Sequence, residues 1–202
     1  MMKVYLYFPL FIFLLSSCKV RDVNTYYPIP VEKEYTDLLV LFVEDVGEGF
    51  YELDKDTYDR FIRHKFNNLG NDSFRARLVK SFKFHFPTTF IHEFQPIFEV
   101  NRDYTFAEFT NNLSNHQVNS ILLITILDDK QITIGGGTAG VSTSSMRSFQ
   151  NHLIDLNIQK PVWSQSGKIN GSVLNSGPFA RDLAKLSANA LRKENLVLPR
   201  PN

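Results

Sequence analysis

The 202-residue chain contains few sulfur-containing residues, with one cysteine and three methionines, and it has a single tryptophan. One cysteine excludes an intrachain disulfide and a zinc site built from several cysteines, so the fold must depend on its core. Excess charge of either sign is also lacking, because 22 basic and 21 acidic residues leave a formal net charge of +1. That balance gives no electrostatic argument for a nucleic-acid partner, which would need a clustered basic face.

The N-terminal apolar run is too short to cross a membrane. Residues 4–15 form a run of twelve residues that contains Pro9, whereas a spanning helix takes roughly 20 residues. Lys19 and Arg21 follow soon after it. A short apolar run after a single charge, Lys3, is typical of a secretory signal.

The only cysteine, Cys18, stands directly after this run, where residues 15–18 read Leu-Ser-Ser-Cys. That segment resembles the lipobox of bacterial lipoproteins. The resemblance implies that residues 1–17 are a signal peptide, that a diacylglycerol is attached to the Cys18 thiol, and that the new amino group is often acylated. Two or three acyl chains hold a protein at a bilayer where one does not. A conventional signal peptide with a coincidental cysteine is the alternative.

We therefore expect a lipid-anchored location in the bacterial cell envelope. Lys19 stands where some lipoproteins carry an aspartate that retains them in the inner membrane, so the outer membrane is favoured. Residues 18–35 are polar and contain Pro28 and Pro30, and we expect them to be a lipidated, extended tether. Residues 36–198 have the length of one domain, and residues 199–202 are expected to be a structureless tail.

The apolar pattern predicts five strands and four helices. Continuous apolar runs suit central strands covered on both faces, and alternation predicts a hairpin near the C-terminus. The predicted strands are residues 37–43, 89–100, 120–127, 149–158 and 162–171. The predicted helices are residues 56–69, 72–82, 103–113 and 179–193, with Thr105 and Glu108 at capping-box spacing. This order predicts an α/β fold: a single layered domain with a mixed β-sheet, helices packed on it, and a C-terminal β-hairpin plus helix.

The C-terminal segment carries a second resemblance. Residues 153–156 read Leu-Ile-Asp-Leu, a turn follows, and residues 161–165 read Pro-Val-Trp-Ser-Gln. This pattern is similar to a recurrent domain of envelope lipoproteins, which includes the penicillin-binding-protein activators and domains like the N-terminal domain of TolB. In residues it covers only 149–196. It implies an accessory or scaffolding role and carries over no catalytic residue.

Acidic side chains follow two of the predicted buried strands. Glu44 and Asp45 follow the first strand, and Asp128 follows the later one. Open α/β sheets place ligands at the carboxyl ends of their strands, so these acids would face one crevice if the two strands are parallel neighbours. They could then bind a cation or act as an acid/base pair. Ordinary turn chemistry is the alternative.

Other motifs point to structure rather than chemistry. Residues 135–140 fit G-x-G-x-x-G, but no predicted helix follows them, so a loop is expected. The five histidines lack metal-ligand spacing, and no metal or cofactor is expected. Phenylalanines recur at even positions through residues 82–98, which predicts an aromatic core face, with a patch for a partner protein as the alternative.

The sequence thus predicts a non-enzymatic, membrane-anchored lipoprotein. It would bind the membrane through the lipid on Cys18 and act as an accessory or scaffolding component that binds another envelope protein. The alternative is a hydrolase or ligand-binding protein that uses Glu44, Asp45 and Asp128. A small-molecule carrier lined with phenylalanines is a weaker third hypothesis.

Overall fold

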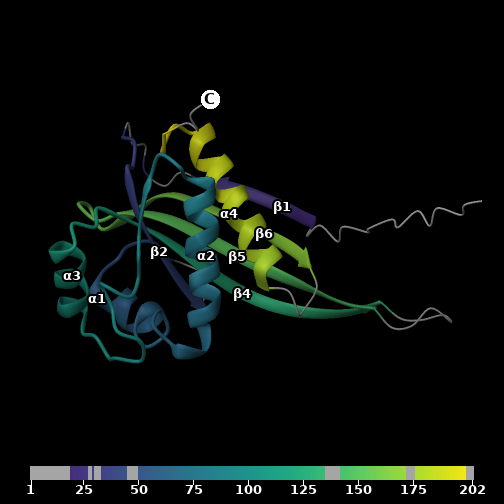
Figure 1. The fold of residues 1–202 in the computed structure, drawn as a ribbon, viewed down its shortest axis with the longest axis horizontal. Coiled ribbons are helices and arrows are strands. Elements are labelled where there is room, and N and C mark those ends of the chain that lie inside the picture. Colours follow the sequence, from purple (N-terminus) through teal and green to yellow (C-terminus); the bar gives the residue numbers. More distant parts are fainter. Residues whose placement is uncertain are drawn as a thin grey trace, which may run out of the picture.

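A six-stranded mixed sheet forms the centre of the protein, in a computed structural model that describes residues 19–26, 29, 33–44, 50–134, 142–171 and 176–198 (Figure 1). The strands are β1 (Lys19–Tyr26), β2 (Asp37–Glu44), β3 (Phe90–His92), β4 (Ser120–Ile134), β5 (Ser142–Asp155) and β6 (Lys160–Gly171). The helices are α1 (Lys55–Thr57), α2 (Asp72–His85), α3 (Phe106–Asn115) and α4 (Ser176–Lys193), with a π-helical turn at Tyr58–Ile62 and a 3-10 turn at Leu69–Asn71. The predicted α/β class with a mixed sheet is confirmed.

The strands lie in the order β1-β6-β5-β4-β2-β3. Strand β2 is parallel to both β3 and β4, whereas β4, β5, β6 and β1 pair antiparallel in succession. The two strongest apolar runs that were predicted as strands are therefore parallel neighbours, with Leu39 opposite Ile121. Both are central, which is why each could be recognised from a continuous apolar run.

The sheet separates two hydrophobic cores. On one face, α2 and α4 lie side by side and bury Leu78, Phe82 and Leu183 against the sheet (Figure 1). On the other face, α1, α3 and the loops around them form an aromatic core. There the Phe66 ring lies 5.0 Å from Phe98 and 5.3 Å from the α3 residue Phe109, measured between ring centroids. Fully burying one such side chain contributes roughly 1.5–3 kcal/mol, so these rings fix α3 against the sheet.

The capping box of α3 forms as its spacing predicts. Thr105 Oγ1 accepts a hydrogen bond from the Glu108 backbone N–H at 3.3 Å, and the Glu108 carboxylate accepts one from the Thr105 N–H at 2.9 Å. At the other end of the chain, Leu196 and Val197 are buried, and the Leu196 carbonyl accepts a hydrogen bond from the Tyr35 N–H at 2.7 Å. The C-terminal segment thus packs back onto the start of the domain.

The first part of the expected tether is instead a strand. Residues Lys19–Tyr26 form β1, which pairs antiparallel with β6. A tether and an edge strand are both extended and polar, and the described side chains of residues 22–26 are all exposed. What decides between them is the open edge of β6, whose unpaired backbone groups are a template for a neighbouring strand.

Two predicted elements are shorter than expected. The helix predicted over residues 56–69 ends at Ile62, because Arg63 leaves the helical region with φ −52° and ψ 137°, and His64 adopts a positive φ of 63°. The strand predicted over residues 89–100 is limited to Phe90–His92, and a turn follows in which the Phe98 N–H donates to the Phe94 carbonyl. In both places tertiary packing overrides local pattern, since the following aromatic residues turn into the second core.

The phenylalanines at even positions do not form one strand face. Phe82 and Phe86 lie at the C-terminal end of α2 and are buried, as are Phe94 and Phe98 in the following loop. The side chains of Phe84 and Phe90, in contrast, are 67% and 65% exposed. The expectation of an aromatic core is thus met by four rings of the six.

Candidate functional site

Two of the acids predicted at strand ends, Glu44 and Asp128, lie on adjacent parallel strands. Glu44 is the last residue of β2 and pairs with Ile126 of β4. The prediction that β4 ends before Asp128 is wrong, because β4 continues to Ile134 and Asp128 pairs with Ser148 of β5 after a bulge. The long antiparallel partner β5 explains the extension, since its backbone continues to pair with the polar residues of β4.

The proposed cleft of acids remains a prediction. Glu44 is exposed, Asp45 lies outside the described residues, and so does the side chain of Asp128. Cys18 and the glycine motif at residues 135–140 also lie outside them. Among the described residues there is no group of three or more His, Cys, Asp or Glu side chains placed to hold a metal ion.

A cavity of about 420 Å³ lies over β1, β6 and β5. The residues that line it are Asn24, Tyr26, Phe50, Tyr51, Leu127, Gln150, His152, Pro161, Ser164, Gln165 and Ser166. Residues alternate across the hairpin, so Leu153 and Trp163 belong to the core under α4, whereas their neighbours His152 and Ser164 line this cavity on the opposite face. The cavity is therefore built by the part of the sheet that α1 and α3 leave uncovered.

His152 and Ser164 form a buried pair at the bottom of this cavity. They are cross-strand partners, and His152 Nδ1 lies 2.7 Å from Ser164 Oγ. Burial lowers the pKa of His152 to about 4, so its ring is uncharged at neutral pH. The Phe50 ring lies 5.3 Å from the imidazole, between centroids. Within the described part of the chain, the imidazole bonds only to Ser164, so the acid that would complete a catalytic triad is not among its partners.

The sequence contained no local signal for this pair. His152 and Ser164 are twelve residues apart, and they meet only because the β5–β6 turn sets the register of the hairpin. A register shift between Leu153 and Ile154 also affects which residues face each other. Alternation alone would place both side chains on one face, but not opposite each other.

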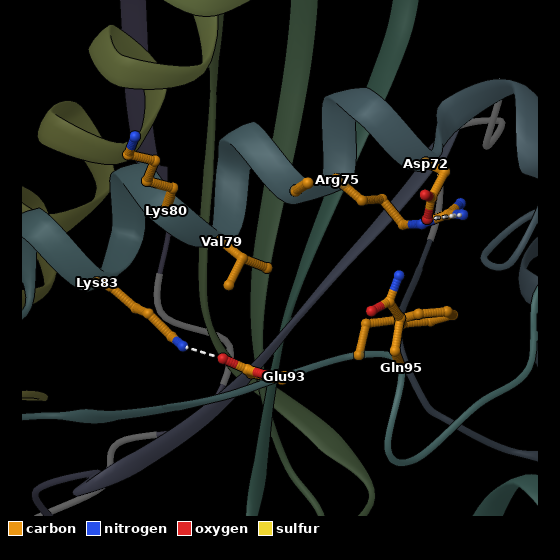
Figure 2. A pocket seen from close by; sticks show the side chains of 9 residues that line it. Asp72, Arg75, Val79, Lys80, Lys83, Glu93 and Gln95 are labelled. Atoms are coloured by element: carbon orange, nitrogen blue, oxygen red, sulfur yellow. Dashed lines mark hydrogen bonds and ion pairs between the residues drawn. The ribbon is translucent and has the colours of Figure 1, made fainter.

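A second cavity, of about 370 Å³, separates α2 from residues 93–95 (Figure 2). Arg75 of α2 is buried, lies 4.9 Å above the Phe94 ring, and donates to the Phe66 carbonyl and to Asp72 at 3.2 Å each. Lys83 donates to Glu93 at 2.6 Å across the cavity, as Figure 2 shows. These contacts tie α2 to the loop that follows it, which indicates a structural role.

Asp155 joins the start of the domain to the end of β5. Its carboxylate accepts hydrogen bonds from Lys33 Nζ at 2.9 Å, from the Tyr35 hydroxyl at 2.8 Å and from the Asn157 N–H at 2.8 Å. Burial alone would raise the pKa of Asp155, but these three donors outweigh it and hold the pKa below its usual range. The same burial raises the pKa of Tyr35. This network therefore serves the fold.

Each helix within the described ranges falls short, in length or in apolar character, of what a bilayer-spanning segment requires. No family model and no curated protein matches the sequence.

Several solved structures are similar in outline. The PelC dodecamer from Paraburkholderia phytofirmans matches at 10% identity and a TM-score of 0.46, over 88% of this chain and 99% of that chain. Lipoprotein GNA1162 from Neisseria meningitidis matches at 11% identity and a TM-score of 0.36, over 78% of this chain and 99% of that chain. A minor lipoprotein from Acinetobacter baumannii matches at 8% identity and a TM-score of 0.34, over 81% of this chain and 97% of that chain. At these identities and TM-scores, nothing about the function of this chain follows from the likeness.

Proposed function

We propose that this chain is a lipid-anchored, non-enzymatic lipoprotein of the bacterial cell envelope, and that its domain binds another envelope protein. The observation that carries the proposal is the position of Cys18. It follows the apolar run of residues 4–15 and a pair of serines, and it is the only cysteine in the chain. An apolar run of that length suits a cleaved signal and not a membrane span.

The start of β1 gives this anchor a specific geometry. Lys19, the residue directly after Cys18, already pairs with Asn170 of β6. One residue of extended chain spans only about 3.3–3.6 Å, so a lipid on Cys18 would hold the edge of the sheet close to the bilayer. A partner would then meet the domain near the membrane surface.

A non-enzymatic role is supported by the structural contacts that several described charged side chains make within the fold. Asp155 joins two segments, Arg75 of α2 packs over Phe94 in the loop that follows, and Arg63 forms a paired contact with Asp103 at 2.7 and 2.8 Å. The C-terminal resemblance also implies an accessory role. Its Val-Trp pair, Val162 and Trp163, is buried in the core under α4 and serves packing.

Replacing Cys18 with serine tests the anchor. Cys18→Ser removes the thiol that would carry the diacylglycerol, so we expect the protein to leave the membrane fraction and to lose the lipid mass at its N-terminus. Ser17→Ala keeps a small residue before the cysteine and is the matched control, which should retain both. Intact-protein mass spectrometry and detergent phase partitioning measure the result. If Cys18→Ser still partitions into the detergent phase and still has the mass of the lipidated protein, the proposal is wrong.

The partner and the membrane need separate measurements. Crosslinking in intact cells followed by capture of this chain should recover the same envelope protein repeatedly, and recovery should fall for Cys18→Ser because the unanchored domain is diluted away from the membrane. Failure to recover a reproducible partner would argue against a scaffolding role. Density separation of the two membranes tests the preference for the outer membrane.

A further inference from the structure

The cavity over β1, β6 and β5 carries two aromatic side chains that the fold leaves open. Tyr26, at the end of β1, is 66% exposed, and Tyr51, just before α1, is 79% exposed. A single exposed ring is ordinary surface, whereas apolar groups gathered at one hollow can mark a ligand-binding groove. Both rings lie at the same cavity although they come from separate segments, so one ligand can contact both.

The floor of the cavity is a grid of polar side chains. Asn24 of β1 lies opposite Ser166 of β6, and Ser166 lies opposite Gln150 of β5. These three residues therefore form one row across three strands, with about 4.8 Å between strands. None of the three side chains hydrogen bonds to another described residue, so their donors and acceptors remain available to a ligand.

A second row runs beside the first. Tyr26 lies opposite Ser164, and Ser164 lies opposite His152. The two rows are two residues apart along each strand, or about 7 Å. The two rows therefore present amide, hydroxyl and imidazole groups together on one face of the sheet.

The lining excludes several classes of ligand. No described residue that lines the cavity carries a formal charge at neutral pH, and the pKa of His152 is lowered to about 4 by burial. Among these described residues, a charged ligand would thus find no counter-charge. A purely apolar ligand would bury the amides of Asn24 and Gln150 without partners, at a cost for each group.

We propose that this cavity binds a neutral oligosaccharide. The apolar C–H face of a sugar ring can stack on Tyr26 or Tyr51, while its hydroxyl groups both donate to and accept from Asn24, Gln150 and Ser166. The cavity volume of about 420 Å³ lies within the roughly 300–1,000 Å³ of small-molecule sites. This site does not depend on the anchor at Cys18 or on a protein partner.

Calorimetry on the complete mature protein tests the site. The protein is purified in a zwitterionic detergent, because an alkyl glycoside would occupy a sugar site. The neutral probes are cellotetraose and the tetramer of N-acetylglucosamine, each titrated up to about 10 mM, a range that covers weak millimolar affinities. The charged comparison is the tetramer of galacturonic acid.

The variants separate the site from a general loss of structure. Tyr51→Ala and Gln150→Ala each remove one contact of the proposed site, and Phe84→Ala removes an aromatic ring of matching exposure on α2, away from the cavity. Circular dichroism verifies that each variant is folded.

We expect at least one neutral tetramer to bind, with affinity lowered about tenfold or more by Tyr51→Ala and by Gln150→Ala and unchanged by Phe84→Ala. We also expect the galacturonic acid tetramer to bind at least about tenfold more weakly. The proposal is overturned if neither neutral tetramer binds, if the three variants have equal affinity, or if the charged tetramer binds as well as the neutral ones.

Discussion

His152 should make the stability of this domain depend on pH in a defined direction. Its side chain is 3% exposed, and burial lowers its pKa to about 4. In the unfolded chain the imidazole titrates near 6.5. Between these two values the unfolded chain takes up a proton that the folded chain does not, so the free energy of unfolding falls as the pH falls.

The magnitude follows from the two pKa values. The fall from 6.5 to about 4 corresponds to roughly 3 kcal/mol, at about 1.4 kcal/mol for each tenfold change in proton affinity. This contribution is fully present above pH 6.5 and is lost by about pH 4. Asp155 acts in a lower window, because its pKa lies below the usual carboxyl range and its contribution is lost only as the pH falls through that lowered value.

Urea denaturation between pH 7.5 and 4.5 measures the effect. We expect wild-type protein to lose about 2–3 kcal/mol over this range from His152 alone, and His152→Gln to lack that component while it retains any slope due to carboxylates. His116→Gln is the matched control, because it makes the same substitution at an exposed side chain. If wild type and His152→Gln lose the same stability between pH 6.5 and 4.5, the reasoning is refuted.

Two further changes test the packing. Gly167→Ala would bring a Cβ to within 2.9 Å of Phe149 Cζ and should destabilise the domain by about 1–3 kcal/mol in urea, whereas Gly177→Ala on α4 has nothing within 4 Å and should not; equal midpoints would contradict the crowding. Thr105→Ala removes the capping box of α3 and should reduce the free energy of unfolding by about 1 kcal/mol, and Thr105→Ser should recover most of it; a loss that Thr105→Ser fails to restore would count against the cap.

Local pattern predicted the elements whose own residues decide their structure. The run of β2 buries Leu38, Val40 and Phe42 on one face and its alternate residues on the other, so a continuous apolar segment could only be a central strand. The cap of α3 lies within four consecutive residues, and the apolar stripe of α4 within one helix. None of these depends on where the rest of the chain lies.

The elements that were mispredicted depend on a distant partner. Nothing within residues 19–26 distinguishes a tether from an edge strand, and pairing with β6 makes the difference. The helix after α1 stops at Ile62 because the loop that follows must reach Asn67, whose side-chain amide donates to the Glu99 and Arg102 carbonyls. Such contacts join residues more than thirty positions apart, beyond the range of any local pattern.

The amino-acid order by itself determined the lipobox-like segment at Cys18, the α/β class, and the existence of the two central strands, because each depends on residue type and short-range periodicity. Only the tertiary structure brought Tyr26, Ser164 and His152 into one row and placed Tyr51 at the same cavity. Those residues come from three strands and a loop. Their meeting depends on strand order and register, which are settled when the whole sheet assembles.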